Sequence, residues 1–200
     1  MDTQEITLRD KILEISRRQL FVEGHKSLSM RGIAKKVGVS ATSIYLYFEN
    51  KDHLLHTLIE ESVEDLSSTI EQEVVGKVGT IDKFEATING YVNFAMSNPE
   101  KYDIIYNVNS TAMSRYPKEK FRKARRSYES LVKVIEEGVS EGLMALESPV
   151  IAAYSIWAQL HGVVSVVLNQ RLDSRIDKDR FIKESLEHIV QGFLVRTTVS

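Results

Sequence analysis

The residues best suited to binding chemistry lie between Ser29 and Lys51, where hydroxyl groups, cations and small apolar side chains follow closely on one another. Hydroxyls and cations bind phosphate oxygens, while small polar and apolar groups contact base edges and thymine methyls. This segment therefore predicts an interface for double-stranded DNA. The expected contacts come from Ser29, Arg31, Ala41, Thr42, Ser43, Tyr45, Leu46, Tyr47 and Lys51.

Two short helices around a tight turn would position these side chains. Ser29 can cap a first helix whose apolar residues fall on one face, at spacings of three, one and three: Met30, Ile33, Ala34 and Val37. Gly38 ends this helix, and Gly38-Val39-Ser40 is long enough for a three-residue turn. Ser40 then caps a second helix that starts at Ala41. The pattern predicts a helix-turn-helix.

The second helix can be oriented by taking Ile44 and Phe48, four residues apart, as its buried pair. Thr42, Ser43 and Leu46 then point away from the core, and the two tyrosines project from opposite flanks towards the phosphates. Asn50 is expected to cap the next helix, beside Lys51. The alternative is an ordinary helical hairpin with surface tyrosines. It is disfavoured because the turn, the caps and the two flanking tyrosines would then have to occur together by chance.

The stretch from Ile12 to Leu58 resembles the N-terminal domain of the tetracycline-repressor (TetR) family of bacterial transcription regulators. The resemblance implies an all-α chain of about nine helices: a three-helix DNA-binding head, residues 1–52, and a helical ligand-binding and dimerisation body, residues 53–200. Ala41-Thr42 depart from the Lys-Gly that the family often has. The matching residues are Gly24, Ser29, Arg31, Ile33-Ala34, Gly38-Val39-Ser40, Ile44-Tyr45, Tyr47-Phe48, Lys51 and Leu54-Leu55.

Charge is distributed unevenly along the 200 residues, whose formal net charge is −2. Residues 1–52 carry nine Lys/Arg against seven Asp/Glu, and Gly24 to Lys51 carry five bases against one acid. Positive potential is thus concentrated where the phosphates would lie. Cysteine is absent, and MDTQEITLRD lacks the features of a signal peptide, so we expect a cytoplasmic protein.

Catalytic and metal-binding motifs give no support for an enzyme. The sequence contains no nucleophile elbow, zinc-protease motif, Walker loop or dinucleotide fingerprint. His53, His56 and Glu60 have the spacing of half a metal site, but a solvated helix face explains them more simply. We therefore expect no cofactor and no metal. Two alternatives remain: a helical small-molecule binding protein without DNA-binding function, and an enzyme whose turnover needs His161.

The remainder of the chain predicts further helices rather than strands. A first helix is expected to begin at a capping box of Thr7 and Asp10 and to end at Gly24. A long helix is expected from Lys51 to about Val75, and shorter ones follow the loop at Gly76 to Thr80. A basic run from Lys118 to Arg126 is either a solvated helix face or a site for an anionic ligand or a second DNA contact. The further helices are expected from about Phe84 to Ala95, Glu100 to Val108, Pro117 to Gly142, Pro149 to Leu168 and Asp177 to Arg196.

Pro149 to Leu168 contains no charged residue and is long enough to span a membrane. Its proline and its polar residues argue against insertion. A helix that is apolar all round must be covered on every side, so we expect a second subunit to cover it together with the last helix. The predicted homodimer interface comprises Val164, Leu168, Ile189, Gly192 and Phe193.

The body also contains candidate ligand-binding residues. Trp157, His161 and Gly162 resemble the W-x-x-x-H-G pattern of one subgroup of these C-terminal domains. His161 is either a hydrogen-bonded core residue or the polar contact of a pocket. The resemblance implies a dimeric repressor of a palindromic operator, released by a small, largely apolar effector that binds among Met96, Tyr102, Tyr106, Tyr128, Trp157 and His161.

Overall fold

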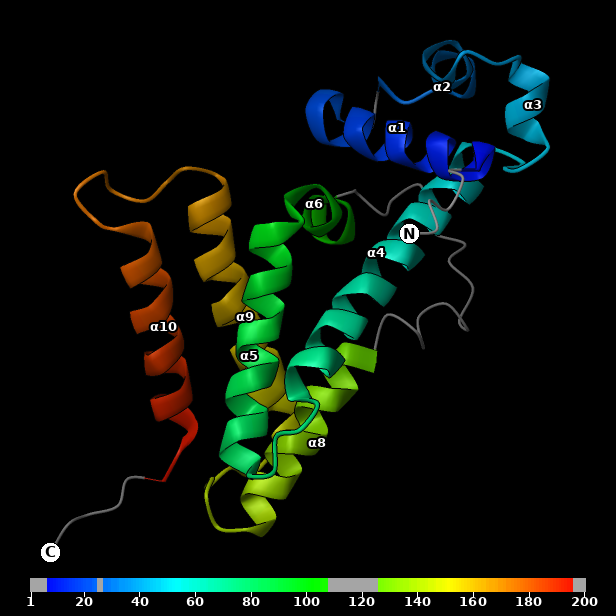
Figure 1. The fold of residues 1–200 in the computed structure, drawn as a ribbon. Coiled ribbons are helices and arrows are strands. Elements are labelled where there is room, and N and C mark those ends of the chain that lie inside the picture. The colour runs from blue at the N-terminus through cyan, green and yellow to red at the C-terminus, as the bar shows by residue number, and fades with distance from the viewer. Residues whose placement is uncertain (1–6, 25–26, 108–125, 196–200) are drawn as a thin grey trace, which may run out of the picture. The chain divides into compact units, whose positions relative to one another are not determined.

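The computed structural model describes residues 7–24, 27–107 and 126–195. The regular elements in these ranges are all α-helices (Figure 1), so the predicted all-α fold is confirmed. They are α1 (Leu8–Glu23), α2 (Met30–Val37), α3 (Ala41–Tyr45), α4 (Lys51–Val74), α5 (Thr80–Ser97), α6 (Pro99–Asn107), α8 (Arg126–Ser140), α9 (Pro149–Leu168) and α10 (Lys178–Phe193).

The chain separates into two compact units. The first comprises residues 1–64 and 100–123, and the second comprises residues 65–99 and 124–200. Helix α4 therefore contributes to both units, and α6 belongs almost entirely to the first. The domain boundary predicted after residue 52 stays a prediction.

Helix α1 begins and ends where its local sequence indicates. The Asp10 backbone N–H donates to Thr7 Oγ1 at 3.2 Å, and the Thr7 N–H donates to Asp10 Oδ2 at 3.2 Å. This reciprocal capping box satisfies two backbone donors that would otherwise lack a partner at the helix start. The Gly24 N–H donates to the Leu20 carbonyl at 2.9 Å and closes the last turn. Both predicted ends of α1 are confirmed.

The first unit has an apolar core to which all of its first four helices contribute. Helix α2 packs against α1 and α3, as Figure 1 shows in dark and light blue. Residues three or four apart supply the buried face of each helix, which is the spacing of a helix with one apolar side. The fully buried side chains include Ile12, Ile33, Ile44, Phe48, Leu54, Leu55 and Leu58.

The second unit is a helical bundle in which α5, α8 and α9 pack against one another and α10 packs on α5 and α9. Helix α9 buries a single stripe: Ala152, Ala153, Ile156, Leu160 and Val164. The opposite side of this helix is exposed in the single chain, so the expectation that a second subunit covers it stays a prediction. Among the described residues, α9 is the one helix long and apolar enough to cross a membrane.

Two predicted helix ends differ from the structure. The C-terminal helix ends at Phe193 rather than Arg196, because Leu194 is extended and the Val195 N–H donates to the Leu143 carbonyl at 2.9 Å. The helix expected from Pro117 is seen over Arg126–Ser140. Its predicted start and nearly all of the basic run from Lys118 lie outside the described residues.

Candidate nucleic-acid interface

Side-chain caps and one glycine build the turn between α2 and α3. Ser29 Oγ accepts from the Gly32 N–H at 3.1 Å, and Ser40 Oγ accepts from the Ser43 N–H at 3.1 Å. Gly38 between them has φ 83° and ψ 31°, a left-handed conformation in which glycine avoids the clash of a Cβ atom. The predicted caps and the predicted glycine turn are therefore confirmed.

Helix α3 is shorter than expected. The predicted helix continued to Phe48, but α3 ends at Tyr45, and the expectation of a regular helix over residues 41–48 is wrong. The N–H groups of Tyr47 and Phe48 both donate to the Ile44 carbonyl at 3.0 Å. The bond from Tyr47 spans only three residues and tightens the last turn. Ile44 and Phe48 are nevertheless both buried, as predicted.

The three residues between Ile44 and Phe48 in the sequence are exposed to solvent. Leu46 is 80% exposed, and Tyr45 and Tyr47 are also exposed, as is Thr42. Large apolar and aromatic side chains rarely remain in solvent without a binding role when they are contiguous. Three adjacent residues thus project from the end of α3 and form an amphipathic surface with phenol hydroxyls at both sides of a leucine.

Not every predicted contact residue is equally available. Ser29 Oγ accepts the cap hydrogen bond of α2, and Ser43 Oγ lies 2.9 Å from Ser40 Oγ within the cap of α3. Ala41 is half-buried. Their hydrogen bonds assign the two serines a structural role in the turn, while their contact with DNA stays a prediction.

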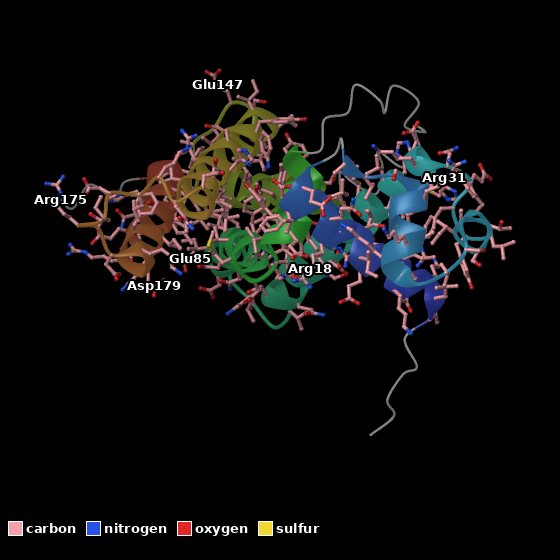
Figure 2. The ribbon with its side chains drawn as sticks, turned by 90° about the horizontal axis from the view of Figure 1, so that it is seen from above. Arg18, Arg31, Glu85, Glu147, Arg175 and Asp179 are labelled. Carbon is pink, nitrogen blue, oxygen red and sulfur yellow. The ribbon has the colours of Figure 1, made fainter. Side chains whose placement is uncertain are left out.

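Basic side chains surround the turn. Arg31 is exposed on α2, and Figure 2 labels it among the helices of the first unit. Lys51 is the first residue of α4, where Asn50 Oδ1 accepts from the His53 N–H at 2.8 Å and caps the helix as predicted. Lys36 pairs with Glu23 at 2.6 Å and holds the pKa of that carboxyl below its usual range.

An ion-pair group between α1 and α4 escaped the sequence analysis. Glu61 lies 3.0 Å from Arg9 and 3.6 Å from Arg17. Neither arginine belongs to the helix-turn-helix pattern, and no local spacing links residues that are 52 positions apart. Only the packing of α4 against α1 reveals them.

Part of the predicted ligand-binding set meets in the second unit. The Tyr128 and Tyr154 ring centroids are 4.5 Å apart, Tyr154 and Trp157 are 6.5 Å apart, and Trp157 stacks on His161 at 5.6 Å. We call these four residues the aromatic series. Partial burial lowers the pKa of His161, because desolvation favours the neutral imidazole. Sequence analysis missed Tyr154, although it lies one turn before Trp157 on the same helix.

The other predicted ligand residues lie elsewhere. The ring centroids of Tyr102 and Tyr106 lie 4.7 Å apart on α6, within the first unit, with the two rings tilted by 53°. Met96 lines a groove of about 580 Å³ between α5 and α10, which does not include the aromatic series. Figure 2 labels one residue from each wall of this groove, Glu85 and Asp179. Met96 thus belongs to a different surface from Trp157 and His161.

The residues predicted at the dimer interface differ in their exposure to solvent. Val164 is 0% exposed and Ile189 is buried, so both side chains contribute to the core of their own unit and cannot form the contact surface expected of them. Leu168 and Phe193 are half-buried, and Gly192 is exposed. The exposed apolar side of α9 lies instead at Val150, Ile151 and Tyr154.

His53, near the start of α4, has a structural role. His53 Nδ1 accepts from the Glu49 N–H at 3.3 Å, and its ring meets the Phe48 ring edge-on at 5.8 Å. Within the ranges that the structure describes, no group of three potential metal ligands occurs. Through these contacts His53 stabilises the segment that follows α3.

Two capped helices separated by a glycine turn, on a third and a fourth helix, define a helix-turn-helix domain. A model of bacterial regulatory proteins of the tetR family matches residues 12–58, and a model of the tetracyclin repressor-like C-terminal domain matches residues 84–193. The chain belongs to the TetR family, which is a family of regulatory proteins rather than enzymes.

A known relative agrees with this assignment, and solved structures share the fold. An HTH-type transcriptional regulator of Mycobacterium bovis is 31% identical over 98 residues, covering 48% of this chain and 42% of that protein. The chain therefore matches less than half the length of this curated relative. A protein of unknown function from Rhodococcus sp. RHA1 is similar in fold, with TM-score 0.81, 21% identity and coverage of 98% and 100%. A TetR family transcription regulator from Marinobacter aquaeolei VT8 has TM-score 0.77, 16% identity and coverage of 94% and 96%.

Proposed function

We propose that this protein is a ligand-responsive transcription regulator of the bacterial cytoplasm, which represses by binding a palindromic operator as a homodimer. The observation that carries DNA binding is the exposed triplet Tyr45-Leu46-Tyr47 at the end of a capped α3, anchored by the buried Ile44 and Phe48. A rigid support beneath exposed side chains is what sequence recognition in a major groove requires.

Each exposed side chain has a proposed task at the groove. The hydroxyl groups of Tyr45 and Tyr47 donate hydrogen bonds to phosphates on the two groove walls, and Lys51 and Arg31 add positive charge. Thr42 and Leu46 meet base edges and thymine methyls. Because Ala41-Thr42 replace the Lys-Gly frequent in the family, no lysine contacts DNA at this point. The protein should therefore grip phosphates as its relatives do but read a sequence of its own.

The exposed side of α9 is the proposed centre of the dimer. Ile151 is 70% exposed, Tyr154 is exposed, and the stripe continues over the small residues Ala158 and Gly162. An uncharged stripe along a 20-residue helix is costly to leave in water. A twofold axis would pair it with its copy, with Leu168, Gly192 and Phe193 at its margin.

The aromatic series is the proposed effector site. Three aromatic rings and a neutral imidazole offer mainly stacking surfaces with few hydrogen-bonding groups, which suits a small, largely apolar ligand. Met96 lies on a different surface, and Tyr102 and Tyr106 belong to the other unit, so their contact with a ligand stays a prediction apart from this site. An effector that binds one conformation of the body more tightly than another would shift the protein towards that conformation. The resulting change in operator affinity is limited by the ratio of the effector's affinities for the two conformations.

A binding titration tests the DNA-binding proposal directly. Genomic fragments retained by the purified protein are sequenced, and a labelled fragment is titrated beside a scrambled duplex. We expect Tyr47→Phe and Lys51→Ala to weaken both duplexes alike, whereas Thr42→Ala chiefly alters the preference between them. Lys133→Ala removes an exposed cation of α8 in the second unit and serves as the control for Lys51→Ala. Wild-type protein that retains no fragment above scrambled DNA would refute the proposal.

Effector binding has its own readout. Trp157 is the only tryptophan of the chain, so its fluorescence reports on the aromatic series alone. A library of small apolar compounds is screened for a change in this fluorescence and for release of the retained DNA. Compounds that release DNA while leaving Trp157 fluorescence unchanged would place the effector site elsewhere.

A further inference from the structure

One acidic side chain lies between two arginines where α4 crosses α1. Glu61 Oε1 accepts from Arg9 at 3.0 Å, and its other carboxylate oxygen lies 3.6 Å from Arg17. The Arg17 side chain is only 17% exposed, and within the part of the chain that the structure describes its Nε has no hydrogen-bond partner. Glu61 is therefore the carboxylate that balances two cations on the inner side of α1.

Arg9 makes a second contact that leads towards the DNA-facing surface. Its guanidinium lies 5.9 Å from the centroid of the Phe48 ring, within the range of a cation–π interaction. Phe48 is 1% exposed and directly follows Tyr47. Its N–H donates to the Ile44 carbonyl and so closes the last turn of α3. The contacts run without a gap from Glu61 through Arg9 to the end of α3.

We propose that Glu61 is a positioning residue for DNA recognition: it holds the Arg9 guanidinium over Phe48 and thereby orients the exposed Tyr45-Leu46-Tyr47 triplet. The inference rests on the proposed function, since positioning matters only if this triplet contacts DNA. It extends the binding site to an acid in α4 that touches no DNA.

Guanidinium geometry is essential to this arrangement. A planar guanidinium can donate to a carboxylate at its edge while its face lies over an aromatic ring, whereas a lysine ammonium cannot do both in the same way. The ion pair alone is partly exposed and adds little stability. The ion pair instead fixes the position of the Arg9 guanidinium, and the guanidinium in turn holds the end of α3 in place through Phe48.

The sign of the expected effect separates positioning from electrostatics. Neutralising Glu61 makes the first unit more positive, and simple attraction to phosphates would then strengthen DNA binding. Positioning predicts the opposite, weaker binding to the preferred duplex. Glu14 is an exposed acid of α1, so Glu14→Gln changes the charge equally without touching Arg9 and is the matched control.

The experiment compares operator affinity and its salt dependence for wild type, Glu61→Gln and Glu14→Gln, with helicity and thermal unfolding measured on the same samples. We expect Glu61→Gln to weaken binding at least about fivefold, as for coupled neighbouring residues, with an unchanged salt slope because no phosphate contact is lost. Glu14→Gln should bind as tightly as wild type or tighter. Equal or tighter binding by folded Glu61→Gln would overturn the inference.

A second pair of variants keeps the test decisive if Glu61→Gln fails to fold. Arg9→Lys retains the charge and an ion pair but loses the flat guanidinium, while Arg18→Lys makes the same exchange at an exposed arginine of α1, labelled in Figure 2. We expect weaker operator binding only for Arg9→Lys. Two equally tight variants would refute the inference, whereas wild-type protein that binds no DNA would refute the proposed function instead.

Discussion

Replacing Ile151 by glutamate should separate the stability of the chain from that of its dimer. Ile151 is the third residue of α9, and its N–H donates to the Ser148 Oγ cap at 3.4 Å. Glutamate at this position completes the Ser-x-x-Glu capping box and adds an acid to the first turn. The isolated chain should therefore be as stable as wild type or more stable by a few tenths of a kcal/mol.

The cost to the dimer follows from exposure. Full burial of an isoleucine contributes roughly 1.5–3 kcal/mol, and 70% of the Ile151 surface remains for a partner to cover. Each copy would then contribute about 1–2 kcal/mol, and a twofold dimer loses both contributions. The dimer Kd should rise roughly 30- to 1,000-fold, and the buried charge adds to this loss.

Sedimentation velocity over a dilution series measures the dimer Kd, and urea unfolding measures the stability of the chain. Val78→Glu is the matched control, because Val78 is an exposed apolar residue of the loop before α5. It should leave the Kd unchanged. A folded Ile151→Glu protein with the wild-type Kd would show that the exposed side of α9 does not form the interface.

Three further predictions concern the fold. Gly38→Ala forces a Cβ into a left-handed residue at φ 83° and should cost about 1–2 kcal/mol; an unchanged midpoint of thermal unfolding would contradict it. Gly90→Ala would place a Cβ 3.0 Å from Ile70 Cα, and this overpacking, about 1–3 kcal/mol, should exceed the helix-propensity gain of about 1 kcal/mol and lower the urea midpoint. Because burial lowers the pKa of His161 from 6.5, the unfolded chain binds protons more readily, and stability should fall as the pH drops below about 6.5. His161→Gln should show a smaller loss of stability between pH 7.5 and pH 5.5 in urea titrations, and an equal loss would refute this.

Local sequence was sufficient for the helix caps, in which a side chain bonds to a backbone N–H three residues away. Thr7 and Asp10 cap α1, and Ser29 and Ser40 cap α2 and α3, because a hydroxyl or carboxylate reaches only the N–H groups of its own first turn. Gly38 ends α2 for the equally local reason of its left-handed backbone. The helix-turn-helix and the buried pair Ile44 and Phe48 were therefore predictable, and they are the part of the candidate site that depends least on the rest of the chain.

Features that depend on packing were not predictable from the same patterns. The end of α3 at Tyr45 was missed because propensity alone does not indicate where a turn tightens. Helix α9 is uncharged throughout, so its composition gives no sign of which side faces inwards. Packing against α5, α8 and α10 buries Val164, which was predicted at the dimer interface, and leaves Ile151 exposed instead.

The sequence by itself determined that this chain is helical, belongs to a family of regulators and carries a helix-turn-helix with exposed tyrosines, because those properties follow from residue types a few positions apart. Tertiary structure alone decided which atoms support that surface. Glu61 and Arg9 lie 52 positions apart and meet 3.0 Å from each other only when α4 crosses α1. Contacts of that kind have no local signature, since they depend on how two helices pack rather than on how either one forms.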